Sequence, residues 1–286
     1  MRPSYATQEA LLNLIDNALK EDIGDGDHSA LSAIPNEAIG KAQLIIKDNG
    51  ILAGIELAEM IFKRVDENLS VDTKILDGAS VKKGEIGLYV TGKVQSILQA
   101  ERLVLNCMQR MSGIATFTKY LQSKIAHTPC KLLDTRKTTP NFRVLEKWAV
   151  AIGGGTNHRF GLYDMIMLKD NHIDYAGSIT QAVKAAQRYL SEKQKKLRIE
   201  VETRNLEEVK EALAVGGVDV IMLDNMPLEM MREAVQIVHH QCQTEASGGI
   251  TEENITAIAE TGVDFVSVGA LTHSIKSMDI SLKAIK

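Results

Sequence analysis

Three groups of basic residues lie within residues 134–172 and could together bind a small polyanion. This stretch holds six Lys and Arg residues against four Asp and Glu, although the chain of 286 residues has a formal net charge of −4. An arginine offers a planar fork that matches a carboxylate or phosphate, and a lysine offers a compact point charge. A pocket built from all three groups would suit a ligand with several negative charges. The groups are Arg136-Lys137, His158-Arg159 and Lys169 with His172.

The residues beside these cations favour a binding site over a solvated basic surface. Glycines at 153–155 precede the second group, and glycine lets a backbone approach a ligand closely. The apolar run 165–168 ends abruptly in Lys169, as a buried strand ends in a functional loop. Hydroxyl groups also lie between the cations, at Thr135, Thr138 and Thr139.

The composition is that of a globular protein whose basic residues are concentrated locally. Hydrophobic residues make up 44% of the chain and charged residues 24%, which is typical of soluble domains. Because the net charge is −4, we expect neither nucleic acid nor membrane as a partner. The three cysteines lack metal-ligand spacing, and no apolar signal segment or membrane span is evident, so we expect reduced thiols and a cytoplasmic location.

Residues 1–115 have the pattern of a small α+β domain. Strand-like runs separated by Asp-Gly and Lys-Gly turns occupy much of 41–94, with a helix expected at about 55–65. Ser96 and Gln99 have the spacing of a capping box that would open a long helix. Ser112 and Gly113 would end or bend that helix, and we place the domain boundary just after it.

Residues 116–286 repeat the order strand, loop, helix. Such alternation predicts a parallel sheet with crossover helices. Six strands rather than eight predict a β/α barrel that is either incomplete or contains strands that the pattern does not reveal. The C-terminal segment could pack back on the first domain. Strands are predicted near 131–134, 165–168, 197–201, 218–223, 244–246 and 265–268, and helices near 178–189, 206–215, 227–239 and 252–260.

Polar, charged or glycine residues follow every predicted strand of this barrel. Active sites of β/α barrels are built at the carboxyl ends of the strands, and the last two strands often bind phosphate there through backbone N–H groups. Glu202 and Asp224 follow two central strands and could hold Mg²⁺, which prefers oxygen ligands. The last two strands are followed by Ser247-Gly248-Gly249 and Gly269-Ala270.

Many of these segments resemble the signature blocks of quinolinate phosphoribosyltransferases, and weaker similarity extends over essentially the whole chain. Asn141 departs from the family, which usually has glycine there, but asparagine tolerates the left-handed conformation better than most residues. The matching blocks are 135–140 (TRKTTP), 153–159 (GGGTNHR), 161–164 (GLYD), 169–172 (KDNH), 200–202 (EVE), 223–225 (LDN), 245–250 (EASGGI) and 267–269 (SVG).

The resemblance implies an α+β sandwich domain followed by an incomplete β/α barrel, the type II phosphoribosyltransferase fold. It implies that quinolinate and phosphoribosyl pyrophosphate react, with Mg²⁺, to give nicotinate mononucleotide, carbon dioxide and pyrophosphate in NAD biosynthesis. It also implies a homodimer with shared active sites, in which the neighbouring subunit supplies Arg102.

The resemblance further assigns roles to individual residues. Lys137, Lys169, Glu202 and Asp224 are the catalytic candidates, and the last two would address the ribose and the metal. The pyridine dicarboxylate would be surrounded by Arg102, Arg136, His158, Arg159 and Lys169, with Lys137 nearby, and Thr135 would also bind substrate. The 5′-phosphate would be held by Ser247, Gly248, Gly249, Val268, Gly269 and Ala270.

Three other readings are open from the residues. A phosphoribosyltransferase paralogue of the ModD type, associated with molybdenum transport, would share the fold. A Schiff-base aldolase would use Lys169 or Lys137 at a strand end as its nucleophile. The third reading is a binding or scaffold protein without catalysis.

Overall fold

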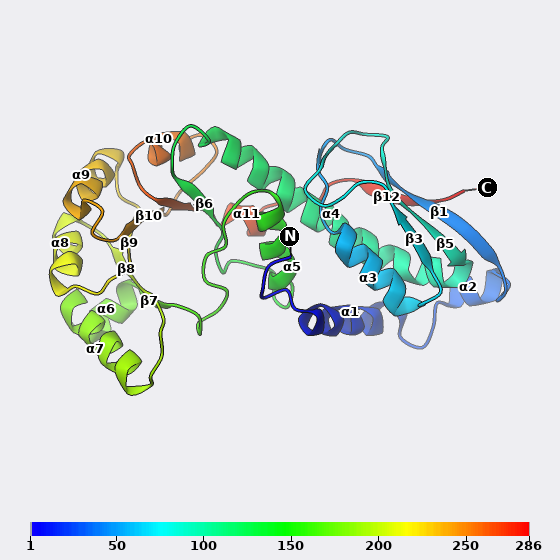
Figure 1. The fold of residues 1–286 in the computed structure, drawn as a ribbon, viewed down its shortest axis with the longest axis horizontal. Coiled ribbons are helices and arrows are strands. Elements are labelled where there is room, and N and C mark those ends of the chain that lie inside the picture. The colour runs from blue at the N-terminus through cyan, green and yellow to red at the C-terminus, as the bar shows by residue number, and fades with distance from the viewer. Residues whose placement is uncertain (1, 286) are drawn as a thin grey trace. The chain divides into compact units, whose positions relative to one another are not determined.

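The computed structural model describes residues 2–285, which form two compact units (Figure 1). Within these residues, the first unit contains the chain up to Lys119, Thr138–Gly154 and the segment from Leu271 onward. The second contains Tyr120–Lys137 and Gly155–Ala270. Helix α4 (Val94–Lys124) runs through the position between residues 115 and 116 where the sequence suggests a boundary.

The first unit is built on a four-stranded antiparallel sheet in the order β12-β1-β5-β3. Along β1, buried Ala42, Leu44 and Ile46 alternate with more exposed residues, so one face of the strand is apolar. The last strand, β12, returns from the C-terminal segment to pair with β1. The strands are β1 (Ile39–Ile46), β3 (Ser70–Thr73), β5 (Ile86–Lys93) and β12 (Ile280–Ile285), and β2 (Gly50–Ile51) pairs separately with β4 (Ser80–Val81).

The helices of the first unit pack apolar faces inward. The expected helix at 55–65 is confirmed as α3, which buries Ile55, Ala58 and Phe62 on one side. Thr7 caps the first helix by accepting the N–H of Ala10 at 3.1 Å. Besides α4, the helices are α1 (Gln8–Ile23), α2 (His28–Ala33), α3 (Ile55–Val65), α5 (Arg143–Ile152) and most of the short α11 (Ala270–His273).

Both ends predicted for the long helix α4 are wrong, and tertiary contacts explain why. The helix begins before Ser96, whose hydroxyl donates to Asp66 at 2.8 Å instead of capping the helix. It continues past Ser112 and Gly113 to Lys124. The buried Ser112 hydroxyl accepts the N–H of Ala53 at 2.9 Å, and a Cβ on Gly113 would lie less than 3.0 Å from the carbonyl oxygen of Lys276.

An ion pair between half-buried Arg110 and buried Glu146 joins α4 to α5 within the first unit. Arg110 donates to Oε1 of Glu146 through Nε at 3.0 Å and through a terminal nitrogen at 2.8 Å. The Glu146 side chain is fully buried and also accepts the backbone N–H of Thr139 at 3.0 Å. These contacts anchor the residues that follow Lys137 in the chain.

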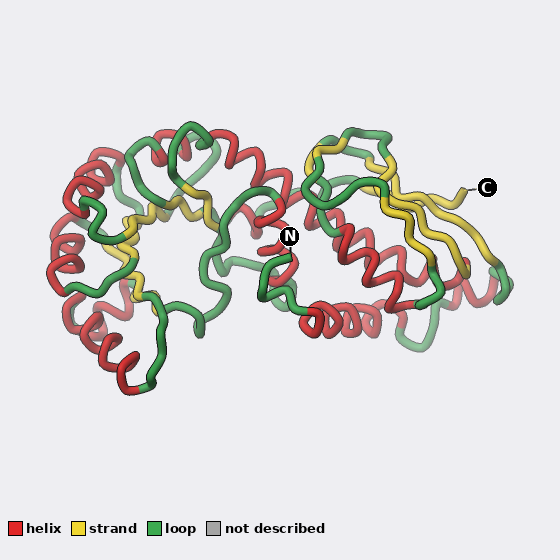
Figure 2. The backbone as a smooth tube through the Cα atoms, in the orientation of Figure 1, coloured by secondary structure: helices red, strands yellow, loops and turns green. Residues whose placement is uncertain are grey.

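The second unit is a parallel sheet of six strands in the order β6-β11-β10-β9-β8-β7, which confirms the incomplete barrel. In Figure 2 its strands form a curved inner layer with the helices outside them. All five residues of β8 are buried, as expected for a parallel strand covered on both faces. The strands are β6 (Lys131–Leu133), β7 (Ile166–Leu168), β8 (Ile199–Thr203), β9 (Val220–Asp224), β10 (Gln243–Ser247) and β11 (Phe265–Ser267).

Four helices lie close to where the sequence pattern predicts them, and a fifth, α6, forms where the pattern predicts a loop. In α7, Ile179, Ala182, Val183 and Ala186 share the i, i+3, i+4, i+7 face that is buried. Among the helices between residues 2 and 285, none combines the length and hydropathy that a membrane crossing requires. The helices are α6 (Asp170–Ala176), α7 (Ile179–Glu192), α8 (Leu206–Val215), α9 (Leu228–Val238) and α10 (Ile255–Ala259).

The glycine at position 113 generates a stability prediction. Replacing a glycine inside a helix by alanine ordinarily stabilises it by about 0.5–1 kcal/mol. Gly113→Ala should instead destabilise the protein by roughly 1–2 kcal/mol, because the new methyl group would meet the Lys276 carbonyl. Urea unfolding measures this difference. Asn106→Ala, at an exposed position of the same helix, is the control and should be neutral or slightly stabilising. Equal stability of the two variants would contradict the close packing.

Candidate active site

A cavity of about 730 Å³ lies at the carboxyl ends of the parallel strands in the second unit. This is the face on which β/α barrels place their active sites. Its lining also includes residues that lie in the matching blocks but were not predicted as site residues, among them Glu245, Asn225 and Ser267. The predicted site residues that line it are Thr135, Arg136, Lys137, His158, Arg159, Lys169, Glu202, Asp224, Ser247, Gly248 and Gly249.

The remaining predicted residues do not line this cavity. Arg102 is exposed on α4 and belongs to the first unit. Val268 is buried and donates its N–H to the carbonyl of Leu133 at 3.0 Å. Gly269 and Ala270 come next, just beyond Ser267, which does line the cavity. His172 accepts the backbone N–H of Lys169 at 2.9 Å, so it braces the start of α6.

The loop that carries His158 and Arg159 is held against the open edge of the sheet. Thr156 forms a parallel bridge with Leu133 of the edge strand β6, and its N–H donates to the Leu132 carbonyl at 2.8 Å. The fully buried Asp134 accepts the amide of Asn157 at 2.6 Å and the backbone N–H of His158 at 2.8 Å. The second basic group thereby reaches the same cavity as Arg136 and Lys137.

The cations crowd one another, which suits an anionic ligand. Burial and the charge of the neighbouring Arg136 both lower the pKa of Arg159 from its ordinary value. The guanidinium of Arg159 donates to the carbonyl of Met165 at 3.2 Å, which restrains its direction. A dianion placed among these side chains would relieve their mutual repulsion.

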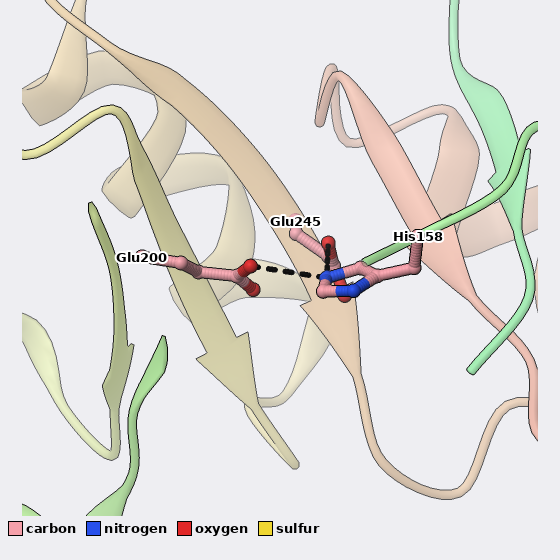
Figure 3. A group of neighbouring side chains, drawn as sticks. All are labelled: His158, Glu200 and Glu245. Carbon is pink, nitrogen blue, oxygen red and sulfur yellow. Dashed lines mark hydrogen bonds and ion pairs between the residues drawn. The ribbon is translucent and has the colours of Figure 1, made fainter. Parts of the chain in front are cut away.

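Two buried glutamates hold the ring of His158, as Figure 3 shows. The Nε2 atom lies 3.0 Å from Oε2 of Glu200 on β8 and 3.4 Å from Oε2 of Glu245 on β10. Both glutamates are at most 1% exposed. The Nδ1 atom accepts the backbone N–H of Arg159 at 2.8 Å.

The protonation of this cluster follows from its hydrogen bonds. Burial alone would lower the pKa of His158, but the hydrogen bonds to Glu200 and Glu245 outweigh it and raise the pKa to about 9. Burial raises the pKa of Glu200, Glu245 adds to the rise, and the bond from His158 partly offsets it. A second ring proton would have to break the contact between Nδ1 and the Arg159 N–H. The raised pKa favours a doubly protonated ring, whereas this contact requires an unprotonated Nδ1. Because the contact constrains Nδ1 directly, we assign His158 as the neutral tautomer with its proton on Nε2.

This assignment also decides which residues can hold a metal. The ligand atoms of His158, Glu200 and Glu245 lie within 4.8 Å of one another, but a protonated Nε2 has no lone pair to offer a cation. Glu202 and Asp224 are better suited, because their carboxylates line the cavity and oxygen is the ligand that Mg²⁺ prefers. One oxygen of each is engaged, by Lys169 at 2.8 Å and by Asn225 at 2.8 Å.

The far end of the cavity is a glycine turn after β10. Gly248 and Gly249 have φ values of 88° and 60°, which favour glycine. A Cβ on Gly248 would overlap the side-chain amide of Asn225. Successive backbone N–H groups in such a turn form a concave site for anions.

Several residues that shape the site were missed from the sequence. Glu200 and Glu202 alternate in β8, so their side chains share a face, and this spacing is the signal that could have revealed Glu200. Glu245 lies within a predicted strand and Asp134 at the end of another, and both are buried at the site. Asn141 adopts the left-handed conformation, with φ of 61°, as its tolerance for that region allows.

Comparison with known proteins places the whole chain in one family. Residues 27–112 match the family model "Quinolinate phosphoribosyl transferase, N-terminal domain", and residues 114–283 match the C-terminal domain. A rice chloroplastic nicotinate-nucleotide pyrophosphorylase [carboxylating] is 48% identical over 98% of this chain and 79% of its own. A probable nicotinate-nucleotide pyrophosphorylase [carboxylating] of Bacillus subtilis is 43% identical over 95% of this chain and 92% of its own.

Solved structures agree with these matches. The nicotinate-nucleotide pyrophosphorylase of Francisella tularensis has a TM-score of 0.91 and 40% sequence identity, covering 98% of this chain and 97% of that one. NadC from Streptococcus pyogenes has a TM-score of 0.92 at 38% identity, covering 98% and 99%. The family models match both domains, and relatives and solved structures of 38% identity or more cover nearly the whole chain: the chain belongs to the quinolinate phosphoribosyltransferase family.

Proposed function

We propose that this protein transfers the phosphoribosyl group of phosphoribosyl pyrophosphate to quinolinate, with decarboxylation, giving nicotinate mononucleotide, pyrophosphate and carbon dioxide. One observation carries the proposal: a single cavity is lined by four basic side chains, by carboxylates that include Glu202 and Asp224, and by a glycine turn. The basic side chains suit the two carboxylates of quinolinate. The carboxylates suit a ribose that develops positive charge, and the turn suits its 5′-phosphate. The basic residues are Arg136, Lys137, Arg159 and Lys169.

The first chemical step separates pyrophosphate from C1 of the ribose. The ribose then has oxocarbenium character, which Glu202 and Asp224 can stabilise from the same cavity wall. Lys169 is paired with Glu202 at 2.8 Å, so the two side chains hold each other in place beside the reacting centre. The pyridine nitrogen attacks C1, and its electron pair forms the new bond.

The second step follows from the charge that the first creates. The pyridine nitrogen is cationic once it is bonded to ribose, and a cationic ring stabilises the carbanion left at C2 when carbon dioxide departs. That carbanion then takes up a proton. The protein therefore needs to supply orientation and a preorganised field, without a covalent intermediate. Lys137 and Lys169 are the cations proposed to act on this step.

We propose Mg²⁺ as the metal that accompanies phosphoribosyl pyrophosphate. Glu202 and Asp224 would hold it together with substrate oxygens, in keeping with the small number of protein ligands that Mg²⁺ commonly uses. When bound, the ion would neutralise charge on the departing pyrophosphate.

We also propose a homodimer with shared active sites. Arg102 is exposed on α4, as a residue destined for a partner's site must be. Leu162, Tyr163 and Tyr175 of the second unit are each more than two-thirds exposed, which is unusual for large apolar side chains and suits a covered surface. An isologous dimer creates two equivalent sites.

The ion pair of Lys169 disfavours a Schiff-base aldolase. A Schiff-base lysine must be neutral to attack a carbonyl, whereas Nζ of Lys169 is held in an ion pair with Glu202 at 2.8 Å. A ModD-type paralogue would share the fold, and substrate selectivity decides between the two transferases.

We infer a cytoplasmic location. Cys107, Cys130 and Cys242 are free thiols, as in a reducing compartment. Burial raises the pKa of Cys107 to about 12, which keeps it unreactive. Cell fractionation would test this inference.

Quinolinate should be used and nicotinate should not. Nicotinate lacks the 2-carboxylate, so cations of the cavity would remain unpaired in its complex, and kcat/KM should be lower by roughly 10²-fold or more. Release of carbon dioxide and formation of nicotinate mononucleotide measure the reaction, with nicotinamide as an uncharged control. Comparable turnover of nicotinate would refute the assignment.

Removal of divalent metal should stop the reaction. Dialysis against EDTA should lower turnover by about 10²-fold or more, and added Mg²⁺ should restore it, because charge on the leaving pyrophosphate is then neutralised again. Melting of the metal-free protein is the control, and should change little if the metal serves the substrate and not the fold. Full activity in excess EDTA would exclude the metal.

Two inactive variants should restore activity when their subunits are mixed. Arg102→Ala and Lys137→Ala should each be nearly inactive, because each removes a cation from both sites of its dimer. After random exchange of equal amounts, half the dimers are mixed, and each has one site with both residues intact. Activity should recover to about a quarter of wild type. In the control mixture, one of the two inactive variants is replaced by Lys196→Ala, a substitution of an exposed residue that precedes β8. Absence of recovery after verified exchange would mean that Arg102 does not act in the partner's site.

A further inference from the structure

His158 links two strands of the barrel to the backbone of Arg159. Its Nε2 meets Glu200 on β8 and Glu245 on β10, which are separated in the sheet by β9. Its Nδ1 accepts the N–H of Arg159 at 2.8 Å. Both ring nitrogens therefore contact the protein, so the ring connects strands β8 and β10 to the loop that carries Arg159.

The orientation of the His158 ring depends on which of its nitrogens carries the proton. The Arg159 N–H points at Nδ1, so Nδ1 is the acceptor, and the proton of the neutral ring lies on Nε2, beside the carboxylates of Glu200 and Glu245. With the proton there, Nδ1 is free to accept the Arg159 N–H. If the proton moved to Nδ1, that nitrogen would face the N–H of Arg159 donor to donor.

The arrangement is costly if its only role is to stabilise the fold. Oε1 of Glu200 and Oε1 of Glu245 are buried and have no hydrogen-bond partner among residues 2–285. Buried polar atoms without partners destabilise a protein, and apolar residues of similar volume are often as stable or more so. Two carboxylates aimed at one N–H therefore indicate a functional constraint on the ring.

We propose that Glu200 and Glu245 are positioning residues that act through His158: they fix its Nε2–H tautomer, and the ring in turn fixes the Arg159 backbone that presents the guanidinium to a substrate carboxylate. The inference rests on the proposed function, because it takes quinolinate as the ligand of Arg159. The Arg159 guanidinium is further restrained by the Met165 carbonyl at 3.2 Å. A small rotation of the backbone would move it away from this contact.

A matched pair of double variants tests the proposal. Glu200→Met with Glu245→Met keeps the volume but removes both acceptors, whereas Glu200→Gln with Glu245→Gln keeps acceptor oxygens without the charges. The methionine pair should raise KM for quinolinate by about tenfold or more and change kcat by less than about threefold. The glutamine pair should stay within about threefold of wild type in both constants, and KM for phosphoribosyl pyrophosphate should be little changed throughout.

A third variant separates positioning from loosening of the strand. Asp264 accepts the N–H of Thr244 at 2.7 Å at the opposite end of β10 from Ser247. Asp264→Asn should lower the melting temperature and leave KM for quinolinate unchanged. An equal rise in KM for Asp264→Asn and the methionine pair would overturn the proposal. No rise in the methionine pair, or an equal rise in the glutamine pair, would also overturn it.

The tautomer can be observed without any substrate. In protein labelled with ¹⁵N-histidine, the His158 signals are identified by their loss in His158→Asn. Wild type should show a protonated Nε2 and an unprotonated Nδ1, and the methionine pair should lose this pattern. A protonated Nδ1 in the wild type would overturn the inference whatever the enzyme transfers. If wild type does not use quinolinate but shows the expected tautomer, the proposed function is wrong. The role of Glu200 and Glu245 in fixing the His158 tautomer then still stands.

Discussion

The open edge of the barrel is the constraint on which the candidate site depends. Strand β6 pairs with β11 on one side only, and the chain fills part of the other side with Thr156. Asp134, buried at the end of β6, then holds the amide of Asn157 and the backbone of His158. A closed barrel would have a further strand here. Because the barrel of this protein is open here, a loop rich in hydrogen-bonding groups lies beside β6. This loop brings His158 and Arg159 to the cavity.

Buried carboxylates hold the loop that carries His158 and Arg159. Asp134 accepts hydrogen bonds from Asn157 and from the His158 backbone, and Glu200 and Glu245 both contact Nε2 of His158. These contacts hold His158 and Arg159 in place before the substrate arrives, so the site needs less reorganisation when an anion binds.

The first unit shows how similar residues serve close packing instead of chemistry. Ser112 and Gly113 lie in the middle of α4, where one bonds to Ala53 and the other admits the Lys276 carbonyl. Arg110 pairs with the buried Glu146, which in turn holds Thr139. Ser112 and Gly113, whose types suggest a helix end or bend, therefore form contacts between distant segments of one unit, and Arg110 does the same.

The amino-acid sequence by itself determined the class of fold, the strands and helices of the barrel, and most residues that line the cavity. It did so because parallel strands place their carboxyl ends at one edge, so local patterns of apolar runs and polar ends are sufficient. The sequence did not reveal the bracing of His158 by Glu200 and Glu245, because these residues come from strands that only the sheet order brings together. It also misplaced both ends of α4, since a distant aspartate took the Ser96 hydroxyl and a distant carbonyl required Gly113. Local patterns describe neighbours along the chain, whereas these features depend on partners that only the tertiary structure supplies.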